Sequence, residues 1–178
     1  LKRLHIGSVP QGITRLIAAA GHTHNRKKQG SPCIELQELS LLDFSQGMDD
    51  LFRVVAPFQT FLRKLSISGG SPDDICWETS LNSFTHVMAP FCAPQPFGKL
   101  ELLSIGPMLY ESAITKHVIR SLVLSSRLTL KTLVLEQIDS LVLDKFMAQE
   151  IWKCRALKEV QLHRFDTTNS LQDAFQAI

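Results

Sequence analysis

Two histidines that stand two residues apart, His22 and His24, are the side chains most suited to metal chemistry. Imidazole nitrogens bind zinc, and a pair at this spacing could share one ion. A zinc site needs three or four converging ligands, however, and the surrounding stretch "GHTHNRKKQGSPC" places no acid or cysteine directly beside the pair. We therefore interpret both histidines as residues of a polar loop, and we expect no bound metal and no cofactor.

The sequence also lacks a motif that would position a nucleophile or a phosphate. The stretch "SGGSPDD" at Ser68–Asp74 is rich in glycine, but it has no lysine of the kind that a phosphate-binding loop requires. There is no G-x-S-x-G motif. The basic "NRKK" at Asn25–Lys28 fits a nuclear-import or phosphate patch or a solvated loop, and we interpret it as a loop. We expect that the chain is not an enzyme and has no small-molecule substrate.

The cysteines and tryptophans give little further evidence of a chemical site. The four cysteines are far apart and form no C-x-x-C motif: Cys33, Cys76, Cys92 and Cys154. This spacing argues against a disulfide framework and against a zinc site. We interpret Trp77 and Trp152 as anchors in the core or in loops, with a binding hot spot as the alternative.

Composition narrows the classes of partner. The chain has 178 residues, of which 44% are hydrophobic and 20% are charged, so it can bury a sizeable core and form one domain. Its formal net charge of +2 is too small to argue for nucleic acid or an anionic membrane. No apolar run approaches the roughly 18 residues of a membrane span, and no signal segment opens the sequence. We expect a cytoplasmic or nuclear domain with a protein partner, and neither nucleic acid nor membrane.

A hexapeptide with apolar residues at positions one, four and six occurs six times. The copies are "LKRLHI" (1–6), "LQELSL" (36–41), "LRKLSI" (62–67), "LELLSI" (100–105), "LKTLVL" (130–135) and "LKEVQL" (157–162). Alternation at positions four and six is the period of a strand with one buried face, and units that recur at this spacing pack against their neighbours. The copies therefore predict adjacent parallel strands with a buried column at position four: Leu39, Leu65, Leu103, Leu133 and Val160.

Helical patterns lie between the copies. The stretches "LFRVVAPF" (51–58) and "FTHVMAPF" (84–91) align residue for residue, with apolar residues at i, i+3 and i+7. Pro57 and Pro90 are expected to end these helices, because proline cannot donate a backbone hydrogen bond. We predict further helices at 13–20, 112–124, 144–153 and 169–178.

These copies resemble the motif of leucine-rich-repeat proteins, and the long units with helices are similar to the ribonuclease-inhibitor-like branch, which includes the repeats of F-box proteins. The resemblance implies an α/β fold: a leucine-rich-repeat solenoid of about six irregular repeats, with a curved parallel sheet on the concave side and helices on the convex side. We expect residues 1–178 to be a single domain and a fragment of a longer chain. Such repeats usually have Asn or Cys three residues after the last leucine, whereas this chain has Val9, Phe44, Gly70, Met108, Ile138 and Phe165. The turns are therefore expected to be satisfied by backbone groups or water.

The positions that are not buried define the candidate surface. Row two, the second residue of each copy, is Lys2, Gln37, Arg63, Glu101, Lys131 and Lys158; row three is Arg3, Glu38, Lys64, Leu102, Thr132 and Glu159; row five is His5, Ser40, Ser66, Ser104, Val134 and Gln161. We expect these rows on the concave face, with charges of both signs paired between neighbouring strands and small serines that admit a partner closely.

The predicted partner-binding residues are those of the middle copies: Arg63, Lys64, Ser66, Glu101, Leu102, Ser104, Lys131 and Thr132. The predicted function is a protein-interaction module, and the resemblance extends it to the substrate receptor of an F-box-type ubiquitin ligase. The alternative is a structural subunit or scaffold that packs within a larger assembly through its ends and helices.

Overall fold

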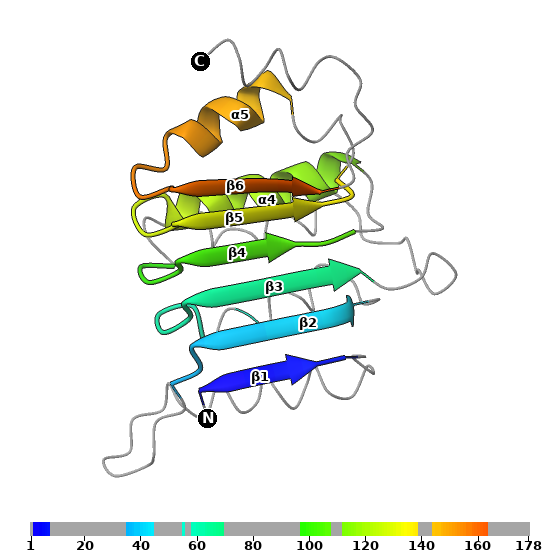
Figure 1. Cartoon of the computed structure of the whole chain (residues 1–178), viewed down its shortest axis with the longest axis vertical. Coiled ribbons are helices and arrows are strands. Elements are labelled where there is room, and N and C mark those ends of the chain that lie inside the picture. Colours follow the sequence, from blue (N-terminus) through cyan, green and yellow to red (C-terminus); the bar gives the residue numbers. More distant parts are fainter. Residues whose placement is uncertain are drawn as a thin grey trace.

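The computed structural model of the chain describes residues 2–7, 35–44, 55, 58–69, 97–107, 112–138 and 144–163. Its elements are six strands and two helices: β1 (Arg3–Ile6), β2 (Glu38–Phe44), β3 (Lys64–Gly69), β4 (Leu102–Ile105), α4 (Ser112–Ser126), β5 (Thr132–Glu136), α5 (Lys145–Trp152) and β6 (Glu159–His163). Figure 1 shows the strands stacked in chain order with every arrow pointing the same way. The described part of the chain is thus an α/β fold with one six-stranded parallel sheet.

The hexapeptide copies set the starts and the register of the strands. Each strand begins at position three of its copy. Every neighbouring pair is parallel and joins equal positions, as in Leu65 beside Leu103 and Leu103 beside Leu133. The same register holds within the copies of the other pairs, and between β2 and β3 it shifts after the copies, between Leu41 and Phe44. The prediction that the six copies form adjacent parallel strands is confirmed.

The buried face of the sheet consists of positions four and six. At position four, Leu39, Leu65, Leu103 and Leu133 are fully buried and belong to one core cluster. Val160 lies in the same register but is only partly buried, because β6 has a sheet neighbour on one side only among the described residues. The predicted column is therefore confirmed for its register and for four of its five buried members.

Both described helices cover this buried face. Val118 and Ile119 of α4 and Met147 and Ile151 of α5 belong to the same core cluster as the strand leucines. The predictions at 112–124 and 144–153 are confirmed. Of the predicted helix 51–58, the structure describes two residues, both of which are buried. The predictions at 13–20, 84–91 and 169–178 lie outside the described residues.

The backbone joins each strand to the next by a repeated arrangement. The carbonyl of Gln37 accepts hydrogen bonds from the N–H groups of Arg63 and Lys64, at 2.7 and 3.0 Å. The row-two carbonyls before β1, β4 and β5, and that of Arg63 before β3, each accept two bonds in the same way, from the row-two and row-three N–H groups of the next copy. After the strands, Gly106 N–H donates to the carbonyl of Ile67 and Gln137 N–H donates to that of His163. These bonds continue the backbone pairing of neighbouring strands at both ends. The predicted turn positions Val9, Gly70, Met108 and Phe165 lie outside the described residues.

One expectation about the core is wrong. Trp152, interpreted from the sequence as an anchor in the core or a loop, is 55% exposed at the end of α5. The buried residues of this helix are Met147, Ala148 and Ile151, and Trp152 does not share their contacts with the sheet. Trp77 lies outside the described residues. Neither α4 nor α5 has the length and apolar character that a helix needs to cross a bilayer.

Candidate interaction surface on the open face of the sheet

The candidate surface is the face of the sheet opposite α4 and α5, which we call the open face. Rows three and five point to it, because they alternate with the buried positions four and six. Row two lies immediately before the strands, at the edge of this face where they begin. The sequence predicted that all three rows share one face, and the structure refines this by placing row two at the edge.

The structure brings the predicted partner-binding residues together over β3, β4 and β5. Lys64, Leu102 and Thr132 are register partners on the three strands, and Ser66 and Ser104 are partners two residues further on. The other three predicted residues, Arg63, Glu101 and Lys131, are joined by ion pairs at the strand starts.

Row three contains an ion triad centred on Glu38. One carboxylate oxygen of Glu38 lies 3.0 Å from Nε of Arg3, and the other lies 3.3 Å from Nζ of Lys64. Register produces this arrangement, since Arg3, Glu38 and Lys64 are direct partners on β1, β2 and β3. The Glu38 side chain is 19% exposed and that of Arg3 is 69% exposed. The carboxylate is therefore shielded, and the cations remain accessible.

Row two contains a second triad centred on Glu101. Its two carboxylate oxygens lie 3.7 Å from an Nη of Arg63 and 3.1 Å from Nζ of Lys131. The predicted pairing of charges between strands is thus confirmed in both rows. Exposed pairs of this kind contribute about 0–1 kcal/mol each to stability, so their main effect is to fix where the cations stand.

Row five is short in the middle of the sheet. Ser40, Ser66 and Ser104 stand side by side on β2, β3 and β4, and each is half-buried. Among the described residues, none of the three hydroxyls forms a hydrogen bond within the chain. Val134 follows them on β5. These positions leave backbone and hydroxyl groups within reach of a bound segment.

The predicted partner-binding set omitted Arg3 and Val134, although the sequence placed both in the rows of this face. Arg3 is the direct partner of Glu38 in row three, and Val134 is the partner of Ser104 in row five. Both could have been included by following row three to β1 and row five to β5.

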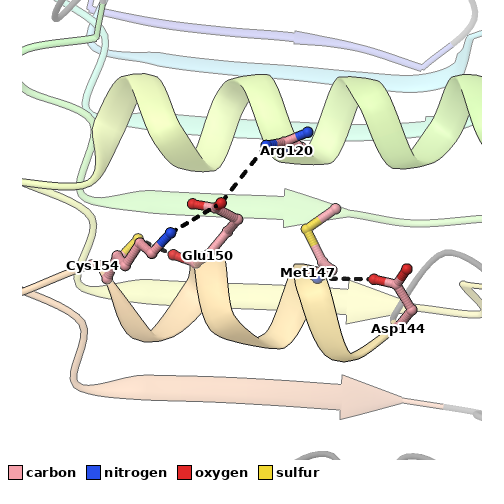
Figure 2. A network of polar contacts seen from close by, with 6 residues as sticks. Arg120, Asp144, Met147, Glu150 and Cys154 are labelled. Carbon is pink, nitrogen blue, oxygen red and sulfur yellow. Dashed lines mark hydrogen bonds and ion pairs between the residues drawn. The ribbon is translucent and has the colours of Figure 1, made fainter.

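On the opposite side of the molecule, ion pairs connect α4 to α5 (Figure 2). Glu150 of α5 accepts ion pairs from Arg120 of α4 at 3.7 Å and from Lys153 at 3.1 Å. Lys116 of α4 bonds to Asp144, whose carboxylate also accepts a hydrogen bond from Met147 N–H at 2.9 Å and so caps α5. These polar contacts fix the packing of α4 against α5.

The pKa of Asp144 reflects this position. Burial alone would raise it, but the hydrogen bond from Lys116, the backbone hydrogen bonds from Met147 and Phe146, and the positive charge of Lys116 hold the pKa below its ordinary value. The ionised carboxylate is therefore stabilised by the fold.

The described residues do not assemble a metal centre. Cys154 is a buried free thiol whose pKa rises to about 11, chiefly through burial and also through the negative charge of Glu150, although Arg127 opposes the rise. Within the described ranges, no three His, Cys, Asp or Glu side chains are placed to hold a metal ion. His22 and His24, which the sequence analysis interprets as loop residues, lie outside those ranges, as do the remaining cysteines, Cys33, Cys76 and Cys92.

Comparison with known proteins gives no relative from which a role could be transferred: no protein-family model, no curated protein and no solved structure matches this chain. What the fold and the surface define is a parallel α/β sheet with one face packed under helices and the other open. Its functional assignment depends on the residues of the open face.

Proposed function

We propose that the chain is a protein-interaction domain of the leucine-rich-repeat type, and that its partner binds the open face over β3, β4 and β5. The observation that carries the proposal is the open face itself. In its middle, a row of small, half-buried serines lies beside Leu102 and is bordered by ordered cations. A bound segment can approach such a face closely, and the fixed charges can set its register.

The repeat assignment is supported by the agreement between sequence and geometry. Six copies of one hexapeptide give six parallel strands in chain order, each beginning at the same position of its copy. Helices follow β4 and β5 and pack on the same face. A curved solenoid with this open face as its concave side is the arrangement that we propose for the domain.

The nature of the partner follows from the side chains in the three rows. None of them is Phe, Tyr or Trp, so the face offers no stacking platform for bases. The proposed partner is therefore a protein segment. We place the interaction in the cytoplasm or nucleus. The resemblance to F-box repeat domains extends this to substrate selection for a ubiquitin ligase, which rests on architecture alone.

Site-specific photo-crosslinking tests the proposal. A photoreactive amino acid at Ser66 should crosslink to the partner in cell extract, whereas the same group at the exposed Gln149 of α5 should not. Leu102→Asp and Ser66→Trp should each abolish recovery of that partner while changing the melting temperature little, since neither side chain is in the core. Crosslinks from Gln149 and none from Ser66 would contradict the proposal.

The choice of control follows from the helix contacts. Lys116 of α4 is unsuitable as a control, because it bonds to the capping carboxylate of Asp144. Its substitution would disturb the start of α5. Gln149 of α5 is the better control, because its side chain is exposed on the helix side of the molecule.

A second function has a specific observation in its favour. Phe146 and Trp152 of α5 are 73% and 55% exposed, and Leu162 of β6 is also exposed. A subunit that packs within a larger assembly through this end would cover such side chains. If Trp152→Ser and Phe146→Ser release the partner while Ser66→Trp retains it, the assembly role replaces the interaction domain.

A further inference from the structure

The charged residues of the open face give it a net positive charge. Rows two and three together hold six cations (Lys2, Arg3, Arg63, Lys64, Lys131 and Lys158) and three carboxylates (Glu38, Glu101 and Glu159), which gives +3 against +2 for the whole chain. The face therefore carries more than the entire net positive charge of the chain.

The carboxylates of the triads are already occupied. Each oxygen of Glu38 and each oxygen of Glu101 faces a different cation, on the strands to either side. An incoming basic group would have to displace one of these cations. An incoming acidic group meets Arg3, Arg63 and Lys131, whose side chains are about half exposed or more and keep unused N–H donors.

Accessible cations recur on alternate strands from β1 to β5, and the exposed Lys158 adds one more at the start of β6. Arg3 is on β1, Arg63 and Lys64 are at β3, and Lys131 is at β5. Neighbouring strands are about 4.8 Å apart, so the alternate strands β1, β3 and β5 follow one another at intervals of about 9.6 Å. A polyproline II segment has three residues per turn and rises about 3.1 Å per residue, which places every third side chain on one side at intervals of about 9.3 Å.

We infer that the partner segment is an extended acidic peptide with Asp or Glu at every third residue, which crosses the strands of the open face. This inference rests on the proposed function and specifies its ligand. The acidic residues pair with the cations at β1, β3 and β5. The intervening backbone passes over Ser40, Ser66 and Ser104, whose hydroxyls are able to donate to its carbonyl groups.

The spacing is tested with two synthetic peptides of equal composition. One carries Glu at every third position among prolines, and the other carries the same glutamates in one block. Fluorescence anisotropy with the 178-residue chain should give a lower Kd for the spaced peptide, and the Kd should rise with salt because exposed charges are screened. Equal affinity for the two peptides would overturn the inference, as would tighter binding of a single-stranded RNA of equal charge.

Two arginines provide a matched pair of variants. Arg63 and Arg120 have side chains that are 53% and 51% exposed, and each lies 3.7 Å from one carboxylate, but they are on opposite sides of the molecule. Arg63→Gln should weaken binding of the spaced peptide about two- to five-fold, as expected for one exposed pair, and Arg120→Gln should leave it unchanged. Equal effects of the two variants would contradict the assignment to the open face.

Glu101→Gln separates a ligand role from a structural one. Removing this carboxylate frees Arg63 and Lys131, so the spaced peptide should bind more tightly, whereas damage to the fold would weaken it. If Ser66 crosslinks to a cellular partner and the spaced peptide does not bind, the acidic ligand is wrong and the interaction function stands. If crosslinks come only from Gln149, the interaction function itself fails.

Discussion

Leu103→Ala is the substitution that most directly tests how the sheet is built. Leu103 lies in the middle of β4, is fully buried, and has Leu65 and Leu133 as its register partners on either side. Both neighbours are themselves fully buried. The strands that carry them are held at a fixed separation by the parallel hydrogen bonds of the sheet. The space left by the removed atoms therefore cannot close by moving one strand alone.

The expected cost follows from that rigidity. Truncation of a buried leucine to alanine lowers the free energy of unfolding by about 2–5 kcal/mol, and the value rises with the volume of cavity that remains. A site confined by strands on both sides and by core residues of α4 belongs in the upper half of this range. Since single domains have only about 5–15 kcal/mol of stability in all, the loss would be large.

Urea unfolding followed by circular dichroism measures this cost, with Leu102→Ala as the control. Leu102 is the adjacent residue on the same strand and is half-buried on the open face. Its truncation should cost about 1 kcal/mol or less, as substitutions near the surface usually do. The inference about which face is buried would be refuted if Leu102→Ala cost as much as Leu103→Ala, or if Leu103→Ala cost less than about 1 kcal/mol.

Three further predictions concern single contacts. Gly106→Ala should lower the free energy of unfolding by about 1–3 kcal/mol, because an added Cβ would stand 2.8 Å from Cβ of Ser68, and Ser68→Gly in the same chain should recover part of the loss in urea titrations. Asp144→Asn should make the free energy of unfolding less dependent on pH in the acid range. Because the pKa of Asp144 is lowered in the folded protein, its carboxylate stabilises the fold above the unfolded pKa of about 3.9, and this stabilisation is lost as pH falls through the folded pKa. Urea titrations of the two proteins should therefore differ at pH 7 and converge at low pH. If the free energies of unfolding of the two proteins changed with pH in parallel over the whole range, this role of Asp144 would be refuted. Cys154, with its pKa raised to about 11, should resist iodoacetamide at pH 8 in the folded protein and react in urea, as peptide mass spectrometry would show; rapid alkylation without urea would contradict its burial.

The sheet was predictable from sequence because one short pattern specifies it repeatedly. Alternation within each hexapeptide indicates a strand, and recurrence of the pattern fixes which residues of different copies stand together, as Leu65 and Leu103 do. The pairing of Glu38 with Arg3 and Lys64 follows from the same register. The strand segments therefore contained most of the information that the candidate surface needed.

Exposure at the end of the sheet was not predictable in this way. Val160 and Leu162 occupy the same positions as buried residues of earlier copies, but burial depends on a neighbour that a hexapeptide does not encode. Trp152 illustrates the same limit on a helix. Its apolar character suggested an anchor, whereas its place at the end of α5 leaves it outside the contacts that bury Met147 and Ile151.

The identity of strand order and chain order has a consequence for how the molecule folds. Each strand pairs only with the strands of the copies before and after it, so no pairing reaches beyond the adjacent copy. The sheet can therefore grow one copy at a time, because each new strand adds to a neighbour in the chain. The outer strands β1 and β6 are then the first to open, and amide hydrogen exchange should be slowest in the middle of the sheet and faster toward both sides.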